Sequence, residues 1–217
     1  MGLFSKNTCA FCGKELGFLS TALSAYKLAD GQYLCSGCYG EKCSSLVSYN
    51  WIVTRNKAQI LEHMEEMKAK KNRIENEFDV TDVITDYKKT SKILASFDRN
   101  RRIWTSSDYS YRKELFSFDD ISRIEVDIHY NYNETKIIPR KDYIPPRPDM
   151  PKPDRDGYMN GMTLNVYIEN HPYSVIAPVK LDICRESPDL FQTYEAYYNA
   201  VYTHGAKCLE LFESLMK

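Results

Sequence analysis

The spacing of apolar residues between Arg55 and about Glu77 predicts an amphipathic helix. Apolar positions recur there at alternating steps of four and three, and Thr54 is placed to cap the first turn. We expect this helix to dock on its own protein, with a homodimeric coiled coil through residues 55–77 as the alternative. The stripe consists of Ile60, Met64, Met67, Lys71, Ile74 and Phe78.

From Lys92 the period falls to two, which is typical of strands with one buried face. Residues 93–97 and 102–105 flank a turn at 98–101 and predict a hairpin. Four further strands are predicted at 114–118, 121–130, 162–169 and 173–179. In the second of these, Ile124, Val126 and Ile128 alternate with Glu125, Asp127 and His129.

A C-terminal helix is predicted over residues 188–216. Ser187-Pro188-Asp189 supplies a capping hydroxyl, a proline for the first turn and an acid near the positive end of the dipole. Gly205 interrupts this helix and is expected to loosen or kink it. About six antiparallel strands closed by one amphipathic helix is the plan of a PH-like barrel, whose open end the helix covers.

The stretch 131–160 is expected to be an exposed, extended insertion. Six of the nine prolines fall between Pro139 and Pro153, and proline cannot donate to a sheet ladder. Residues 145–148 and 148–151 each match the Pro-x-x-Pro pattern that binds aromatic grooves. An insertion without any partner is the alternative.

Two Cys-x-x-Cys pairs, separated by 22 residues, dominate the N-terminal end. Four thiolates in two chelating hooks suit a tetrahedral Zn²⁺ in a closed structural site, with Cys9, Cys12, Cys35 and Cys38 as ligands. A rubredoxin-like iron site would use the same ligands and stays open. Between the hooks, Asp30-Gly31 predicts a type I′ hairpin turn, and a short helix is expected from Tyr39 to about Val47.

These elements predict an α+β protein in three parts. Residues 1–50 form a zinc ribbon built from a β-hairpin and a short helix, and residues 51–80 form the connecting amphipathic helix. Residues 81–217 form the PH-like antiparallel β-barrel, closed by the C-terminal helix. A module as small as the ribbon has little hydrophobic core, and we therefore expect the metal to supply much of its stability. The binding of structural zinc contributes about 10–16 kcal/mol in zinc peptides.

Composition narrows the functional classes. With 29 basic and 30 acidic residues among 217, the formal net charge of −1 argues against coating of nucleic acid by bulk electrostatics. No segment approaches the ~18 apolar residues of a membrane span, and the first residues lack the apolar core of a secretory signal. Lys6 stands where a myristoylation signal needs Ser or Thr. Seven cysteines fit a reducing compartment, and we expect the cytoplasm.

We expect no catalytic activity. The sequence has no glycine-rich phosphate loop, no Gly-x-Ser-x-Gly elbow and no His-Glu-x-x-His. His204 and Cys208 lie four apart on the C-terminal helix, but two ligands do not make a metal site. His63, His129 and His171 are expected at a helix surface, a strand surface and a turn.

The chain resembles a bacterial family, common in Firmicutes and their phages, known only as a domain of unknown function. The resemblance rests on Met1–Phe4, Cys9–Lys14, Leu28-Ala29-Asp30-Gly31 and Cys35–Cys38, and continues at Phe78–Thr81 and Asn170–Tyr173. It implies a ribbon-like or treble-clef zinc module followed by a PH-like β domain. It supplies no catalytic residues, and it does not cover the proline-rich stretch at 139–153.

The leading hypothesis is a non-catalytic binding or adaptor protein that recognises another protein. One rival is nucleic-acid binding through the ribbon, with lysines for the backbone and rings for the bases. Its residues are Lys6, Lys14, Lys27 and Lys42, with Tyr33, Tyr39 or Phe11. A second rival is binding of anionic lipid headgroups by the PH-like domain, with Arg99, Arg101 and Arg102 as the basic cluster.

Overall fold

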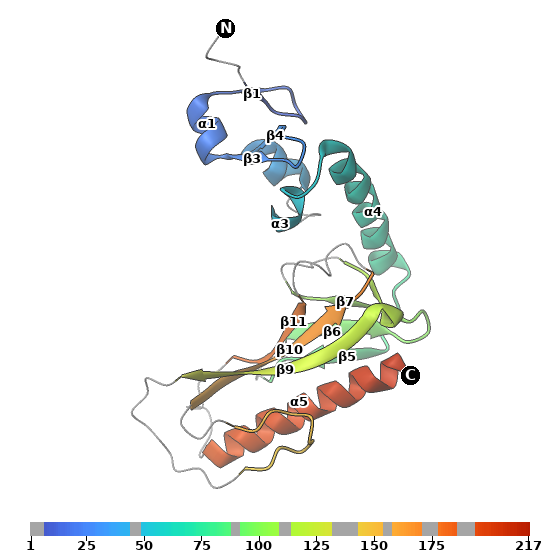
Figure 1. Ribbon diagram of the computed structural model, residues 1–217. Helices are drawn as coiled ribbons and strands as arrows, with labels where there is room; N and C mark the ends of the chain where they lie inside the picture. Colours follow the sequence, from blue (N-terminus) through green and yellow to red (C-terminus); the bar gives the residue numbers. More distant parts are fainter. Residues whose placement is uncertain are drawn as a thin grey trace. The chain divides into compact units, whose positions relative to one another are not determined.

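The chain folds into two compact units (Figure 1). Unit 1 is Met1–Phe78 with Arg112–Glu114, and unit 2 is Asp79–Tyr111 with Leu115–Lys217. The computed structural model describes residues 7–43, 49–87, 92–108, 114–131, 143–153, 158–170, 178–185 and 194–217.

Unit 1 is built from very short strands and helices, followed by one long helix. Two two-residue strands pair antiparallel near the first hook, and a second antiparallel pair carries the chain into the second hook. The elements are β1 (Asn7–Thr8), β2 (Glu15–Leu16), α1 (Phe18–Leu23), β3 (Ala25–Lys27), β4 (Tyr33–Cys35), α2 (Ser36–Cys38), the π-helical turn η1 (Tyr39–Cys43), α3 (Tyr49–Ile52) and α4 (Lys57–Asn76).

The hairpin between β3 and β4 is confirmed, but its turn is not type I′. The N–H of Gly31 donates to Leu28 O at 3.0 Å, so Ala29 and Asp30 are the central residues of the turn. A type I′ turn needs positive φ at both, and neither residue has it. Gly31 follows with φ +80°, so the loop is the three-residue kind, in which glycine takes the left-handed position.

The long helix α4 is confirmed, with a different start. Asn56 caps it, in a reciprocal capping box with Gln59. Thr54 donates instead to Trp51 O, at the end of α3, at 2.7 Å. The chain is helical again at Tyr49–Ile52, beyond the expected end of the short helix at about Val47; residues 44–48 lie outside the described residues.

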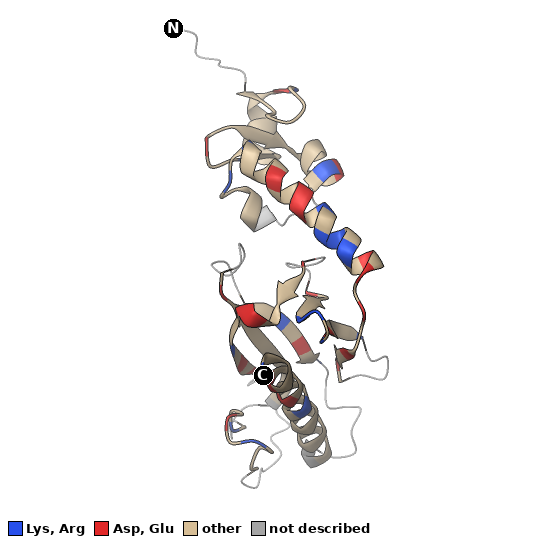
Figure 2. Cartoon of the chain, turned by 90° about the vertical axis from the view of Figure 1, so that its right-hand side faces the viewer, with Lys and Arg blue, Asp and Glu red and all other residues tan. Residues whose placement is uncertain are grey.

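One face of α4 packs into the core of unit 1. Ile60, Met64 and Met67 are buried, as the stripe predicts. His63 is buried too, so the prediction of a surface histidine is wrong. The exposed face carries acids and then bases, seen as red followed by blue in Figure 2. Its one large apolar side chain that is clearly exposed is Leu61, so the described part of α4 has no apolar seam for a coiled-coil partner.

Unit 2 contains two antiparallel sheets and one long helix. One sheet has the strand order β5-β6-β7-β8 and the other β11-β10-β9. The helix α5 packs against β10 and β11. The elements are β5 (Asp82–Thr85), β6 (Ile93–Asp98), β7 (Ile103–Ser106), β8 (Phe116–Ser117), the 3-10 turn η3 (Phe118–Asp120), β9 (Ile121–Asn131), β10 (Tyr158–Ile168), β11 (Val179–Cys184) and α5 (Tyr194–Met216).

Aromatic side chains form the centre of unit 2. Phe212 of α5 meets Phe97 of β6 edge-on at 5.2 Å and Trp104 of β7 at 5.7 Å between ring centroids. Trp104 in turn packs on Phe116 at 4.8 Å. These four side chains are fully buried, so Phe212 contacts two strands of the larger sheet, β6 and β7, and Trp104 links them to Phe116 of β8.

Gly205 does not interrupt α5, which continues to Met216. A Cβ at this position would lie 2.6 Å from Met162 Sδ and 3.2 Å from Met150 Cε. The glycine therefore lets the helix approach β10 closely, and the predicted kink is wrong.

The proline-rich segment is only partly exposed. Within the described residues 143–153, Pro145 and Met150 are buried. Arg147 pairs with Asp149 and with Glu213 of α5, and Tyr202 donates to Pro151 O at 3.2 Å. Neither Pro-x-x-Pro match has both prolines exposed, so an aromatic groove of another protein could not receive either motif in this arrangement.

The strands of unit 2 agree only in part with the predicted strands. The period-two strand at 121–130 is confirmed as β9, and its residues alternate between half-buried and exposed. β5 was not predicted, and β11 begins at Val179, where the strand predicted at 173–179 ends, so the described strands of unit 2 number seven and not about six. They form two sheets, and a closed barrel is not observed among them. Most of the strand predicted at 173–179 and the start of the helix predicted at 188–216 lie outside the described residues.

Candidate metal centre

The first hook is a tight loop closed by backbone hydrogen bonds. The N–H of Cys9 donates to Lys14 O at 2.9 Å, and the N–H of Gly13 donates to Cys9 O at 2.8 Å. Gly13 has φ +72°, a conformation that a residue with a Cβ adopts only with strain. The loop reverses the chain between Cys9 and Lys14, so the sulfurs of Cys9 and Cys12 can face the same point in space.

The second hook follows directly from the hairpin. Cys35 ends β4 and caps the short helix α2, where its sulfur accepts the N–H of Cys38 at 3.3 Å. The two hooks are also joined, because the N–H of Cys35 donates to Cys9 Sγ at 3.4 Å. Ala10 donates to Tyr33 O at 2.7 Å, which fixes the first loop against β4.

The sulfurs of Cys9, Cys12, Cys35 and Cys38 all lie within 4.8 Å of one another. Cys12 Sγ and Cys35 Sγ are 3.9 Å apart, far longer than a disulfide bond of about 2.05 Å. Four sulfurs at about 2.3 Å from a tetrahedral ion would be spaced by roughly 3.8 Å. The four cysteines can therefore hold one metal ion.

The two buried thiols of the cluster have opposite acidities. Burial alone would raise the pKa of Cys9, but backbone N–H donors from Cys35, Cys12 and Phe11 lower it to about 6. Burial, followed by the neighbouring thiols, raises the pKa of Cys38 well above its usual range. Like charges this close oppose one another, so a cation among the sulfurs would favour full ionisation.

The three remaining cysteines, Cys43, Cys184 and Cys208, are buried and lie outside the cluster. Cys43 is buried and lies 3.8 Å from Met64 Sδ, and burial raises its pKa to about 11. Cys208 is also buried, with its pKa raised by burial to about 12. His204, four residues earlier, bonds through Nε2 to Thr85 O at 2.8 Å, so this pair forms no metal site.

A short apolar helix lies between the two hooks and was not predicted. The large side chains of α1 point away from the core, and none of its residues is buried. Phe18 is 87% exposed, Leu19 70% and Leu23 82%. A short apolar run usually predicts a buried element, so nothing in the residue pattern indicates that these side chains face solvent.

Each arginine of the predicted basic cluster has an acidic partner in unit 2. Arg99 Nε lies 2.6 Å from Asp82, Arg101 Nη1 2.8 Å from Asp98 and Arg102 Nη2 2.7 Å from Asp119. Burial alone would raise the pKa of Asp98, but hydrogen bonds from Arg101 and the backbone of Asp79 lower it. The cluster is thus a set of three ion pairs around the turn between β6 and β7.

The residues predicted for nucleic-acid binding do not form a row of free rings. Lys14, Lys27 and Lys42 are exposed, and Lys6 lies outside the described residues. The ring of Tyr39 packs on Tyr26 at 4.7 Å, and Lys57 Nζ lies 5.7 Å from the ring centroid of Phe11. Two of the three candidate stacking faces are therefore engaged within unit 1.

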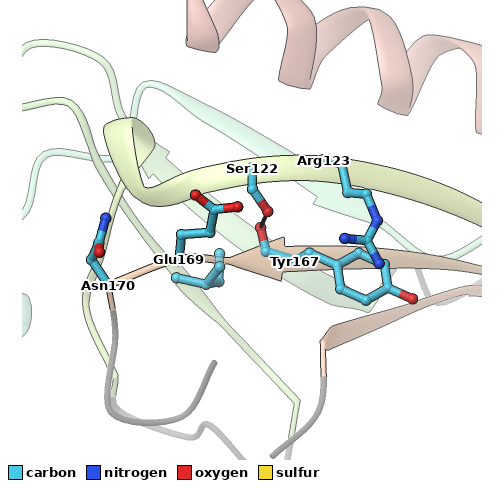
Figure 3. A pocket seen from close by; sticks show the side chains of 6 residues that line it. Ser122, Arg123, Tyr167, Glu169 and Asn170 are labelled. Carbon is cyan, nitrogen blue, oxygen red and sulfur yellow. Dashed lines mark hydrogen bonds between the residues drawn. The ribbon is translucent and has the colours of Figure 1, made fainter. Parts of the chain in front are cut away.

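An open pocket lies where β10 ends, beside the start of β9 (Figure 3). The Arg123 guanidinium lies 3.6 Å from the ring centroid of Tyr167 and bonds to Glu125 at 2.9 Å. Glu125 also accepts the hydroxyl of Tyr167 at 2.7 Å, and these two bonds lower its pKa. The hydroxyl of Ser122 donates to Tyr167 O at 3.2 Å. The lining residues are Ser122, Arg123, Tyr167, Ile168, Glu169 and Asn170.

Comparison with known proteins places a family on part of unit 1 only. Residues 8–67 match the family described as "Domain of unknown function (DUF4428)". The match includes all four cysteines of the cluster and ends within α4, so it does not extend over the whole chain as the resemblance led us to expect. No curated protein matches the chain. No solved structure matches it either.

None of the described helices combines the length and the apolar character that crossing a membrane requires.

Proposed function

We propose that this protein is a non-catalytic, zinc-containing binding or adaptor protein that recognises another protein. The observation that carries the proposal is the gathering of four thiols within 4.8 Å of one another. A zinc ion bound by four thiolates has no open position for water or substrate, so it acts on structure and not on chemistry. What such an ion maintains is the shape of the surface around it.

The pairing of charges in unit 2 argues against a polyanion as the partner of that unit and supports a protein partner. Nucleic acid and anionic headgroups are bound by unpaired positive charge. In unit 2 the guanidinium groups of Arg99, Arg101 and Arg102 are each paired with a carboxylate, and Arg147 is paired with two. The formal net charge of −1 agrees with this pairing. A mixed surface of this kind suits the polar rim of a protein interface.

Unit 2 is, in this proposal, a PH-like domain. Two antiparallel sheets of four and three strands, followed by a C-terminal helix, support it. The N–H of Tyr87, just after β5, donates to Ile183 O of β11 at 2.6 Å, where a closed barrel would join its two sheets. Amide exchange should find the Tyr87 N–H protected; rapid exchange there would argue for two open sheets.

Metal analysis and partner capture together test the function. The purified full chain should carry about one zinc ion per molecule; one iron ion would replace zinc in the proposal. Cross-linking in the source cell should return a protein that the Cys9→Ser/Cys12→Ser variant loses and that an Arg99→Gln variant retains. A partner held equally by all three forms would exclude the metal-held module as the recognition surface.

A further inference from the structure

The helix α1 is the most exposed apolar feature among the described residues. Phe18, Leu19 and Leu23 expose together roughly 400 Å² of apolar surface, within the range of the largest patches on ordinary monomers. Such patches are often functional. Burial of three large apolar side chains in water-free surroundings would be favourable, so α1 needs a partner that its own unit does not supply.

The surroundings of α1 hold it in place while leaving it exposed. Its first turn is closed by Thr21 N–H donating to Gly17 O at 2.9 Å, and Thr21 Oγ1 reaches Leu16 O at 3.4 Å. Leu16 is buried just before the helix, and β3 begins two residues after it. Because α1 lies between Cys12 and Cys35 in the chain, both of its ends are fixed by elements that lead into the cysteine cluster.

The charge pattern selects the kind of partner. From Leu16 to Tyr26 the chain carries no charged residue, and exposed lysines stand close to both ends, Lys14 before and Lys27 after. Apolar side chains bordered by lysine are typical of segments that enter the interface of a bilayer, where lysine meets anionic headgroups. Glu15 lies beside Lys14 and offsets part of that attraction, so the apolar side chains must contribute most of the binding.

Other partners fit these residues less well. A stable dimer needs about 800 Å² from each copy, roughly twice what α1 offers. Hot spots of protein interfaces are rich in Trp, Tyr and Arg, whereas Leu, Ser and Thr are under-represented. The residues of α1 are Phe-Leu-Ser-Thr-Ala-Leu. We propose that α1 inserts Phe18, Leu19 and Leu23 into the surface of an anionic lipid bilayer.

The lipid contact of α1 rests on the proposed function and adds a ligand to it: α1 meets a bilayer, and the protein partner is bound by other surfaces of the same zinc-held module. It differs from headgroup binding by the arginine cluster in its site and in its driving force. Binding should persist in high salt with only partial loss, since apolar burial is not screened. A single small apolar site gives weak, reversible attachment, and a lipid-bound protein partner would strengthen it.

The test is sedimentation of the full chain with vesicles of phosphatidylcholine alone and of phosphatidylcholine with phosphatidylserine. The wild type should bind the anionic vesicles, and the triple variant Phe18→Ser/Leu19→Ser/Leu23→Ser should lose at least ten-fold in affinity. Lys14→Gln or Lys27→Gln should cost about five-fold on anionic vesicles only. The matched control is Val83→Ser/Ile93→Ser, which removes two exposed apolar side chains from unit 2 and should bind as the wild type does.

A fluorescent probe separates insertion from other contacts. Trp51 and Trp104 are both buried, so a Phe18→Trp variant introduces the exposed indole. Its emission should shift to the blue on anionic vesicles, and brominated lipids should quench it. Unchanged metal content and circular dichroism would show that the variants are folded. Absence of vesicle binding by the wild type, equal binding by the triple variant, or a dimer that the triple variant abolishes would overturn the proposal.

Discussion

The two units hold themselves together by different means. The first part of unit 1 has strands of two or three residues, and apart from cysteines its buried apolar side chains up to η1 are Leu16, Leu28 and Leu34. Unit 2 has strands of up to eleven residues around a centre of fully buried aromatic rings. Even with Ile60, Met64 and Met67 of α4 packed beside them, three leucines offset little of the conformational entropy of some forty residues. We therefore expect a metal ion held by the four cysteines to stabilise the first part of unit 1, as hydrophobic burial stabilises unit 2.

The largest expected effect is loss of the metal. Cys38→Ser, or a strong chelator, should unfold residues 7–43, because the ion contributes about 10–16 kcal/mol in comparable zinc peptides. Unit 2 should keep its fold, since its core contains none of the ligands. Amide exchange followed by residue, together with metal analysis, measures both units at once. Cys208→Ala, which removes a cysteine of unit 2, should leave the metal content unchanged.

That prediction would fail if the Cys38→Ser variant kept one metal ion and the exchange protection of β3 and β4. It would also fail if chelation unfolded both units together, because the two would then share one cooperative core.

The second prediction concerns the aromatic core of unit 2. Phe212→Ala removes the ring that meets Phe97 and Trp104, and a buried Phe→Ala change costs about 3–5 kcal/mol. Denaturant unfolding followed by Trp104 fluorescence should show an earlier midpoint. Met216→Ala, on the same helix but 37% exposed, should change stability by less than about 0.5 kcal/mol. Metal content should stay at the wild-type value; its loss would contradict the separation of the two units.

The two units also differ in how much of their structure can be predicted from the sequence. The cysteine hooks and their hairpin follow from local spacing, and β9 and α4 follow from periodicity over ten residues or more. The burial of His63 against Trp51 and the close approach of Gly205 to Met162 are set by tertiary packing, which local spacing does not reveal. The docking of Met150 and Pro151 against α5 overrides the tendency of prolines to signal an exposed loop. The spacing of nearby residues therefore predicts the candidate metal centre. The burial of individual side chains depends on tertiary packing, which that spacing does not reveal.

A smaller effect tests the packing of α5 on β10. Gly205→Leu places a side chain where Met162 Sδ and Met150 Cε already lie, and overpacking of this kind costs about 1–3 kcal/mol. The melting temperature of unit 2 should fall. Lys207→Leu adds the same side chain at an exposed position of α5 and should leave it nearly unchanged. If the two variants were equally stable, Gly205 would not mark a close contact.

The smallest effect is a difference in acid sensitivity, and it depends on His63. This side chain is buried against Trp51, with ring centroids 4.2 Å apart, and its Nδ1 lies 3.4 Å from Glu66. Burial lowers its pKa below 6.5, Glu114 and Glu66 act to raise it, and Lys70 acts to lower it further. Because the folded pKa lies below the unfolded one, unfolding takes up a proton, and stability is lost as the pH falls below about 6.5.

The carboxyl groups of unit 2 shift in the opposite sense. Hydrogen bonds from arginine lower the pKa of Asp82, Asp149 and Glu213 from ordinary values of 3.8 and 4.5. Their contribution is therefore complete above those values and is lost only at lower pH. Between pH 6.5 and 5, unit 1 should lose up to about 1.4 kcal/mol per pH unit through His63, while these groups cost unit 2 nothing.

Comparison of the wild type with His63→Gln isolates this contribution, because acid also weakens thiolate–metal bonds in both forms equally. The difference in unfolding free energy between the two should shrink as the pH falls from 7 to 5. Titration of the His63 ring by NMR provides the direct check. A midpoint above 6.5 would mean that Glu114 and Glu66 outweigh burial, and acid would then stabilise unit 1 through this side chain.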